Sequence, residues 1–183
     1  MALRDFAGIY DDHVWRVYGF FAYWVRSRQD AEDLTQQTFE RALRAWGRYD
    51  ESRSSVSTWL LVIARNLLID HMRANKSARH QPVDEVALES IAASPDRPNV
   101  GLDPELERAL GELSSREREM IALRFGGDLT GPEIAQLTGL SLANVQQILS
   151  RSLRRMRASL DGTGLHETRA PVAERRLVRP SRQ

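Results

Sequence analysis

The sequence contains no cysteine, and its formal net charge is only +1 at pH 7. The missing thiols exclude a disulfide framework and a thiolate metal site, and they fit a reducing cytosol. Because the charges nearly balance, any surface that attracts nucleic acid must be local. The longest apolar run, VYGFFAYWV at 17–25, is far shorter than the roughly 20 residues of a membrane span. The amino terminus carries acids where a signal peptide has its apolar stretch. We therefore expect a soluble, cytoplasmic protein without membrane insertion.

Apolar residues recur at helical spacing through most of the chain, and no strand-like alternation appears. Hydrophobic residues make up 42% of the 183 residues and charged residues 28%, as in ordinary globular proteins. Steps of three and four residues predict a helix or helix pair over 4–27, a helix over 31–46 and another from 57 to about 78. Asp30 is the expected cap of the second helix. These patterns predict an all-α fold.

The helical pattern stops between residues 81 and 103, where prolines and a glycine interrupt it. Residues 84–107 hold seven acids against one base. This composition predicts a flexible acidic linker with room for a short helix at 83–91. We expect two small domains, residues 1–80 and residues 104–160. They are joined by the linker 81–103 and followed by a disordered basic tail, 161–183.

Capping signals organise the second domain. Two S/T-x-x-E capping boxes mark helix starts at 114–117 and 130–133. Gly139 suits the left-handed residue that ends the second of these helices, and Ser141 can cap a final helix to about residue 160. A short helix, a tight turn and a longer helix predict a helix-turn-helix.

The outer face of the last helix presents its side chains in an order that suits DNA. Glutamines come first and arginines later, and a recognition helix inserts its amino-terminal end into the major groove. Glutamine can pair with adenine through two hydrogen bonds, whereas arginine attracts phosphate at any sequence. The alternative is a plain helix hairpin with solvated arginines; the order of side chains favours DNA reading. The outward residues are Ala143, Gln146, Gln147, Ser150, Arg151, Arg154 and Arg157.

The segment STWLLVIARNLLIDHMR, residues 57–73, has one broad apolar arc and one mixed face. Asn66, Asp70 and Arg73 share the mixed face with Trp59. Trp59 either packs in the core or forms a wall beside a ligand. Asp70 either pairs with Arg73 or serves a binding surface, or does both. The pattern alone does not decide between these alternatives.

Three blocks, in this order, resemble the extracytoplasmic-function (ECF) group of bacterial RNA polymerase sigma factors, which is group 4 of the sigma-70 family. They are AEDLTQQTFERALRAW, STWLLVIARNLLIDHMR and LSSREREMIALRFGGDLTGPEIAQLTGLSLANVQQILSRSLRRMR. The first resembles the block that grips the β′ clamp helices of RNA polymerase. The second resembles the promoter-melting block, and the third resembles the helix-turn-helix that binds the −35 element. The resemblance implies a sigma region 2 bundle at 1–80 and a sigma region 4 helix-turn-helix at 104–160.

The resemblance also implies three sets of contact residues. The loop 47–57 matches the segment that captures a flipped base of the −10 element. The set implied for polymerase binding is Asp33, Gln36, Gln37, Glu40 and Arg41. The set implied for the single-stranded −10 element is Ser54, Ser55, Trp59, Arg65, Asn66, Asp70 and Arg73. The set implied for the −35 duplex is Ser141, Ala143, Asn144, Gln146, Gln147, Ser150, Arg151 and Arg154. Without the neighbouring blocks, the residues of the polymerase set would be interpreted as an ordinary charged helix face in contact with solvent.

The sequence departs from the family pattern at four places. The family usually has basic residues where Gln146 and Ile148 stand, an aromatic–acid pair at 131–132, and often an arginine at Val62. These departures put in doubt any transfer of the family's usual −35 sequence, but they leave the fold prediction intact.

The resemblance implies a dissociable specificity subunit rather than an enzyme. Its expected partners are core RNA polymerase, through the β′ clamp helices and the β flap, promoter DNA, and an anti-sigma factor. No nucleophile–base set, metal cluster or phosphate loop is evident, so we expect no cofactor. One alternative is a helix-turn-helix regulator that acts without being a polymerase subunit. Another is a helical adaptor that works through protein contacts alone.

Overall fold

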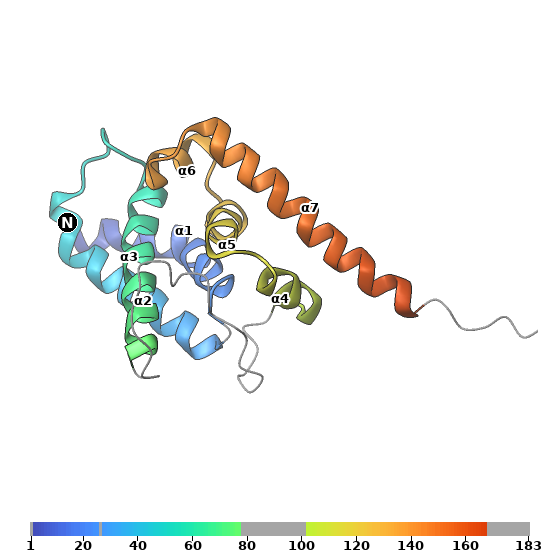
Figure 1. Cartoon of the computed structure of the whole chain (residues 1–183). Helices are drawn as coiled ribbons and strands as arrows, with labels where there is room; N and C mark the ends of the chain where they lie inside the picture. Colours follow the sequence, from blue (N-terminus) through green and yellow to red (C-terminus); the bar gives the residue numbers. More distant parts are fainter. Residues whose placement is uncertain (1, 26, 78–101, 168–183) are drawn as a thin grey trace, which may run out of the picture.

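The computed structural model describes residues 2–25, 27–77 and 102–167, and over these residues its regular elements are all helical (Figure 1). The first half contains α1 (Ala2–Ala22), α2 (Arg28–Ala45), the short 3₁₀ turn η1 (Trp46–Arg48) and α3 (Val56–Ser77). The second half contains α4 (Pro104–Gly111), α5 (Ser115–Ile121), the π-helical turn η2 (Ala122–Gly126), α6 (Gly131–Thr138) and α7 (Leu142–Glu167). The all-α prediction is confirmed. The short helix predicted at 83–91 lies outside the described residues.

The first half is a three-helix bundle around an aromatic and aliphatic core. Phe20 and Phe21 of α1 and Leu60 and Leu61 of α3 are almost completely buried. The predicted cap of α2 was wrong. Ser27, not Asp30, is the N-cap residue, and its hydroxyl accepts a hydrogen bond from the backbone N–H of Asp30 at 3.2 Å. Asp30 instead lies in the first turn, where a carboxylate is favoured by the helix dipole.

The second half follows its sequence signals closely. Both capping boxes form, at Ser114–Glu117 and at Thr130–Glu133. Gly139 has the left-handed φ of 71° that ends α6, and the Ser141 hydroxyl accepts from the Asn144 backbone N–H at 3.3 Å. The helix-turn-helix geometry is therefore set by local hydrogen bonds.

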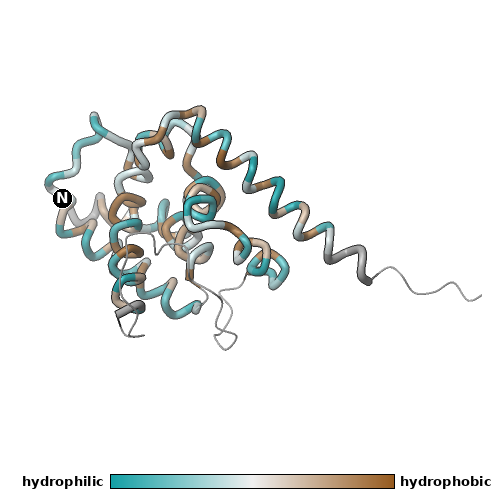
Figure 2. The backbone as a smooth tube through the Cα atoms, in the orientation of Figure 1, coloured by the Kyte–Doolittle hydropathy of each residue, from teal (hydrophilic) through white to brown (hydrophobic). Residues whose placement is uncertain are grey.

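The last helix is longer than predicted. We expected it to end near residue 160, but α7 continues to Glu167, so the first part of the predicted disordered tail is helical. A formed helix gains one hydrogen bond for each added residue, and no proline interrupts the chain before Pro171. α7 extends away from the body of the molecule (Figure 1), and hydrophobic and hydrophilic residues mix along it (Figure 2).

The two halves lie in contact along α1 and α3. One buried apolar cluster contains Phe20 and Leu60 from the first half together with Leu123 and Ile134 from the second half. A second, smaller cluster around Leu110 ties α4, α5 and α7 together. Within the part of the chain that the model describes, no helix is long and apolar enough to cross a membrane.

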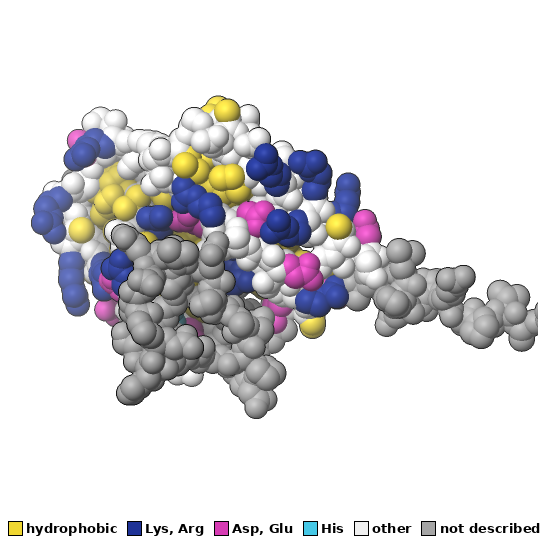
Figure 3. All heavy atoms as spheres, in the orientation of Figure 1, with side chains coloured by type: hydrophobic (Ala, Val, Ile, Leu, Met, Phe, Trp, Pro, Cys, Tyr) yellow, Lys and Arg dark blue, Asp and Glu magenta, His cyan; other side chains and the backbone are white. Residues whose placement is uncertain are grey.

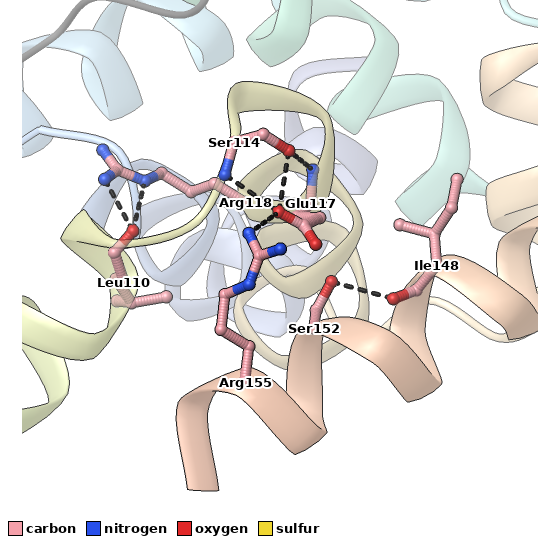
Figure 4. A network of polar contacts seen from close by, with 7 residues as sticks. All are labelled: Leu110, Ser114, Glu117, Arg118, Ile148, Ser152 and Arg155. Atoms are coloured by element: carbon pink, nitrogen blue, oxygen red, sulfur yellow. Dashed lines mark hydrogen bonds and ion pairs between the residues drawn. The ribbon is translucent and has the colours of Figure 1, made fainter. Parts of the chain in front are cut away.

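Glu117 joins the start of α5 to α7 (Figure 4). Its carboxylate accepts from the backbone N–H of Ser114 at 3.0 Å and from the Ser114 hydroxyl at 2.8 Å. It also accepts from the Arg155 guanidinium of α7 at 2.8 Å.

Replacing Glu117 with alanine removes both the capping box and the link to α7. We expect E117A to lower the free energy of unfolding by about 1–2 kcal/mol, measured by urea denaturation. E117Q preserves the capping box and should lose at most half as much, and equal losses in both variants would contradict this account.

Candidate nucleic-acid interface

Three aromatic side chains gather where η1 leads into α3. The rings of Trp46 and Tyr49 are stacked, with centroids 5.1 Å apart and planes 9° apart. Trp59, on the first turn of α3, lies 5.0 Å from Tyr49 and 5.9 Å from Trp46. Trp59 is half-buried and also lines an open cavity of about 400 Å³. One face of Trp59 therefore packs against the other two rings, and another borders the cavity.

The cavity combines flat aromatic surface with cationic and hydrogen-bonding groups. Its residues are Arg48, Tyr49, Asp50, Arg53, Ser54, Thr58, Trp59, Val62, Gln136 and Leu137. The Tyr49 hydroxyl donates to the backbone carbonyl of Ser54 at 2.8 Å, which fixes one wall. Burial, followed by the nearby carboxylates of Glu51 and Asp50, raises the pKa of Tyr49, so its hydroxyl stays protonated. A planar aromatic group could stack on the rings of this cavity, and the arginines could neutralise an anionic group attached to it.

Sequence reasoning missed part of this cavity. It identified the loop 47–57 as a whole but did not single out Tyr49, Arg48 or Arg53. The spacing of three between Trp46 and Tyr49 was the available signal, because it brings both rings to one side of a turn. No pattern in the sequence pointed to Gln136 and Leu137, which reach the cavity from α6.

The polar face of α3 is split between two environments. Asn66, Asp70 and Arg73 are exposed, as a binding face requires. Arg65 instead points to the second half, where its Nε donates to the Glu119 carboxylate at 2.5 Å. Asp70 forms an ion pair with Arg41 of α2 at 3.8 Å. The predicted −10 and polymerase surfaces therefore meet along the seam between α2 and α3.

Ser55 links the start of α3 to the helix-turn-helix. Its hydroxyl oxygen accepts from the Thr58 backbone N–H at 3.2 Å, so it caps α3, and it donates to Glu133 of α6 at 3.2 Å. Burial acts to raise the pKa of Glu133, but hydrogen bonds from Thr130, Ser55 and Thr58 outweigh it and lower the pKa overall. Glu133 is therefore a carboxylate at neutral pH, held against Ser55, a predicted DNA-contact position of the first half.

The outward face of α2 is open along its length. All five residues predicted to bind polymerase, from Asp33 to Arg41, are exposed. Beside them, α1 and α2 enclose a groove of about 690 Å³ with Tyr10, Trp15 and Phe39 in its walls. Trp15 is 76% exposed, far more than a core aromatic residue. The sequence analysis did not single out Trp15, although it lies off the stripe that Val14, Val17 and Phe21 form at steps of three and four residues.

Two family models match the chain, Sigma-70 region 2 over residues 9–78 and Sigma-70, region 4 over residues 104–156. The ECF RNA polymerase sigma factor RpoE of Cereibacter sphaeroides is 31% identical over 166 residues, which cover 85% of this chain and 90% of that protein. The chain belongs to the ECF sigma factors. SigM of Bacillus subtilis, another ECF sigma factor, is 30% identical over 152 residues, covering 82% of this chain and 91% of that protein.

Solved structures support the same fold. RpoE of Bartonella quintana, crystallised with the anti-sigma factor NepR, matches with a TM-score of 0.67 at 21% identity, over 86% of this chain and 98% of that one. CnrH, solved with the cytosolic domain of CnrY, matches with a TM-score of 0.62 at 22% identity, over 87% and 90% of the two chains. As an ECF sigma factor, the protein directs core RNA polymerase to promoters and supports the initiation of transcription.

The −35 candidates of the sigma factor lie along the amino-terminal half of α7. The eight predicted residues from Ser141 to Arg154 are all exposed. Figure 3 shows basic side chains following the course of α7. The departure at Ile148 has a structural reason, because this side chain is half-buried and packs against the central cluster, where a charged side chain would be costly. Gln146 and Gln147 are exposed amides in the second turn of this helix.

Proposed function

We propose that this sigma factor opens promoters by holding a base of the −10 strand in the cavity beside Tyr49 and Trp59. The observation that carries the proposal is the aromatic-walled cavity with Arg48 and Arg53 on its border. Extruding a base from the duplex costs a few kcal/mol, and each base stacked on an aromatic side chain regains about 1–3 kcal/mol. Asn66, Asp70 and Arg73, exposed further along α3, would contact the neighbouring nucleotides and phosphates.

In the same proposal, residues 104–160 form the domain that reads the −35 duplex, and residues 1–80 form the domain that binds polymerase and the −10 strand. Gln146 and Gln147 would contact base edges in the major groove, and Arg151 and Arg154 would bind phosphates one turn later. Ser141, Ala143, Asn144 and Ser150 share this surface. The protein would act in the cytoplasm, by binding rather than by catalysis.

In-vitro transcription with core RNA polymerase and a promoter library tests this function directly. We expect specific transcripts only when both the chain and core polymerase are present. Specific binding to duplex DNA by the chain alone, with no effect on polymerase, would instead support the regulator that works without polymerase.

The exposed face of α2 is the proposed polymerase contact. Replacing Asp33 with arginine reverses a charge on this face without touching the core. We expect D33R to bind core polymerase about tenfold more weakly in a fluorescence titration, with an unchanged melting temperature. D161R makes the same reversal at an exposed position on α7 and should bind normally. Equal binding by D33R and the wild type would remove α2 from the interface.

We also infer an anti-sigma partner. The structure of RpoE from Bartonella quintana contains NepR, and the structure of CnrH contains the cytosolic domain of CnrY. This chain shares the fold of both proteins. Affinity purification from the native host, followed by mass spectrometry, should recover such a protein together with polymerase. Recovery of polymerase subunits alone, from cells grown without an inducing stress, would argue against the partner.

A further inference from the structure

A chain of ring contacts runs through the first half, from the groove between α1 and α2 to the cavity proposed for the −10 base. Tyr10 and Phe39 have ring centroids 4.7 Å apart, and Phe39 lies 6.4 Å from Phe6. Phe6 lies 5.7 Å from Trp46, which stacks on Tyr49 at 5.1 Å. All of these distances fall within the range of about 4.5–7 Å at which aromatic pairs attract one another. We call these five residues the aromatic column.

The column ends on a ring that borders the cavity. Tyr49 lines the cavity, whereas Trp46 lies behind it and does not. The planes of these two rings are only 9° apart, so Trp46 packs on one face of Tyr49. A base that enters the cavity can therefore stack only on the opposite face. The orientation in which Tyr49 receives a base thus depends on Trp46.

Two hydrogen bonds hold Tyr49 in place, but neither of them fixes the plane of its ring. The backbone N–H donates to the Trp46 carbonyl at 3.0 Å, and the hydroxyl donates to the Ser54 carbonyl at 2.8 Å. The hydroxyl oxygen lies on the axis about which the ring turns, and the χ2 torsion of tyrosine has broad minima. The ring could turn about this axis with both hydrogen bonds intact. Stacking on Trp46 is the contact that restricts this rotation.

Trp46 is in turn held from behind by buried rings. It lies in the short turn η1 and is only half-buried, so its own burial does not fix its orientation. Phe6 is 7% exposed and meets Trp46 with the ring planes 66° apart, in an edge-to-face contact. Phe39 of α2 is 5% exposed and meets Phe6 in the same way, at 73°. The turn is thereby tied to both α1 and α2.

We propose that Trp46 and Phe6 are positioning residues for promoter opening, which hold the ring of Tyr49 in the plane that receives a −10 base. They act through Tyr49 and do not touch the base. A ring that is already in its binding orientation loses less freedom when a base stacks on it, so strand capture is favoured. This inference rests on the proposed function, because the role of Tyr49 is assigned there.

The test separates the two steps of open-complex formation by the holoenzyme. Fluorescence of 2-aminopurine placed in the −10 element, followed at several holoenzyme concentrations, gives the affinity of the closed complex and the rate constant of opening. We expect W46L, which removes the ring, to lower this rate constant about fivefold without changing the affinity. F6L, one ring further back, should lower it about twofold. W46F keeps a flat ring beside Tyr49 and should open promoters within about 1.5-fold of the wild type.

A matched control removes a ring from the same bundle outside the column. Phe21 is fully buried and pairs with Phe20 at 5.4 Å. F21L should lower the melting temperature at least as much as W46L, because it leaves a space in the core. We expect F21L to leave the rate constant of opening unchanged. If F21L slowed opening as much as W46L, general loss of stability would explain both results and the proposal would be overturned.

The second measurement combines W46L with the loss of the rings that it is proposed to orient. In a chain that already carries Y49A and W59A, W46L should slow opening by less than about 1.5-fold, since no ring remains to be positioned. A full fivefold loss in this background would overturn the proposal, and so would normal opening by W46L alone. Failure of the proposed function is distinguishable, because the chain with Y49A and W59A would then open promoters as well as the wild type.

Discussion

Replacing both Tyr49 and Trp59 with alanine is expected to lower promoter opening by the holoenzyme about 30-fold or more. Each ring offers a stacking face at the cavity, and loss of stacking costs about 1–3 kcal/mol per base, where 1.4 kcal/mol corresponds to a factor of ten. The loss should fall on strand separation and not on assembly with core polymerase. Permanganate reactivity of unpaired thymines in the −10 element reports the open complex directly.

The matched control keeps the aromatic faces. Y49F with W59F retains two flat rings but removes the hydroxyl that bonds the Ser54 carbonyl. This variant should open promoters within about threefold of the wild type, since stacking is tolerant of ring type. Melting temperatures of both variants separate a folding defect from a binding defect, because Trp59 also packs against Trp46. Full opening by the double alanine variant at normal assembly would show that the cavity does not hold a base.

The sequence was sufficient for the parts of this fold that depend on near neighbours. Both capping boxes and the left-handed Gly139 form because their partners lie within a few residues. The apolar arc of α3 is buried for the same reason, since helical periodicity alone assigns its faces. The misassigned cap of α2 shows the limit of this reasoning. Ser27 and Asp30 are both competent caps, and the choice depends on where the preceding chain leaves α1.

The site was predictable only within each half. Arg65 was expected to contact the −10 strand, but its side chain pairs with Glu119, which is 54 residues away in the sequence. No local pattern in the sequence predicts such a pair. The same holds for Gln136 and Leu137 at the cavity. Gly19 and Gly126 carry no motif that marks them as a contact, although their close approach sets how the halves meet. Long-range contacts depend on the packing of whole helices, which periodicity does not specify.

The recognition helix provides the second large expected effect. Alanine at both Gln146 and Gln147 should abolish preference at the base pairs that these residues contact, with little effect on other positions. One bidentate contact discriminates by about 1–3 kcal/mol, so two together should reduce selectivity by about 100-fold. Both side chains are exposed, so the variant should fold normally. Sequencing of transcripts from a library randomised in the −35 region, transcribed by the holoenzyme, measures preference at every position.

An arginine variant distinguishes sequence-specific contacts with bases from sequence-independent attraction to DNA phosphates. R151A removes a charge from the same exposed face without removing an amide. It should weaken binding to all duplexes about equally and reduce the slope of log affinity against log salt by about one. The glutamine variant should leave that slope unchanged, because no phosphate contact is lost. If the library preference survives the loss of both glutamines, reading of the duplex by this face of α7 is excluded. The selectivity of the holoenzyme would then have to come from the −10 cavity alone.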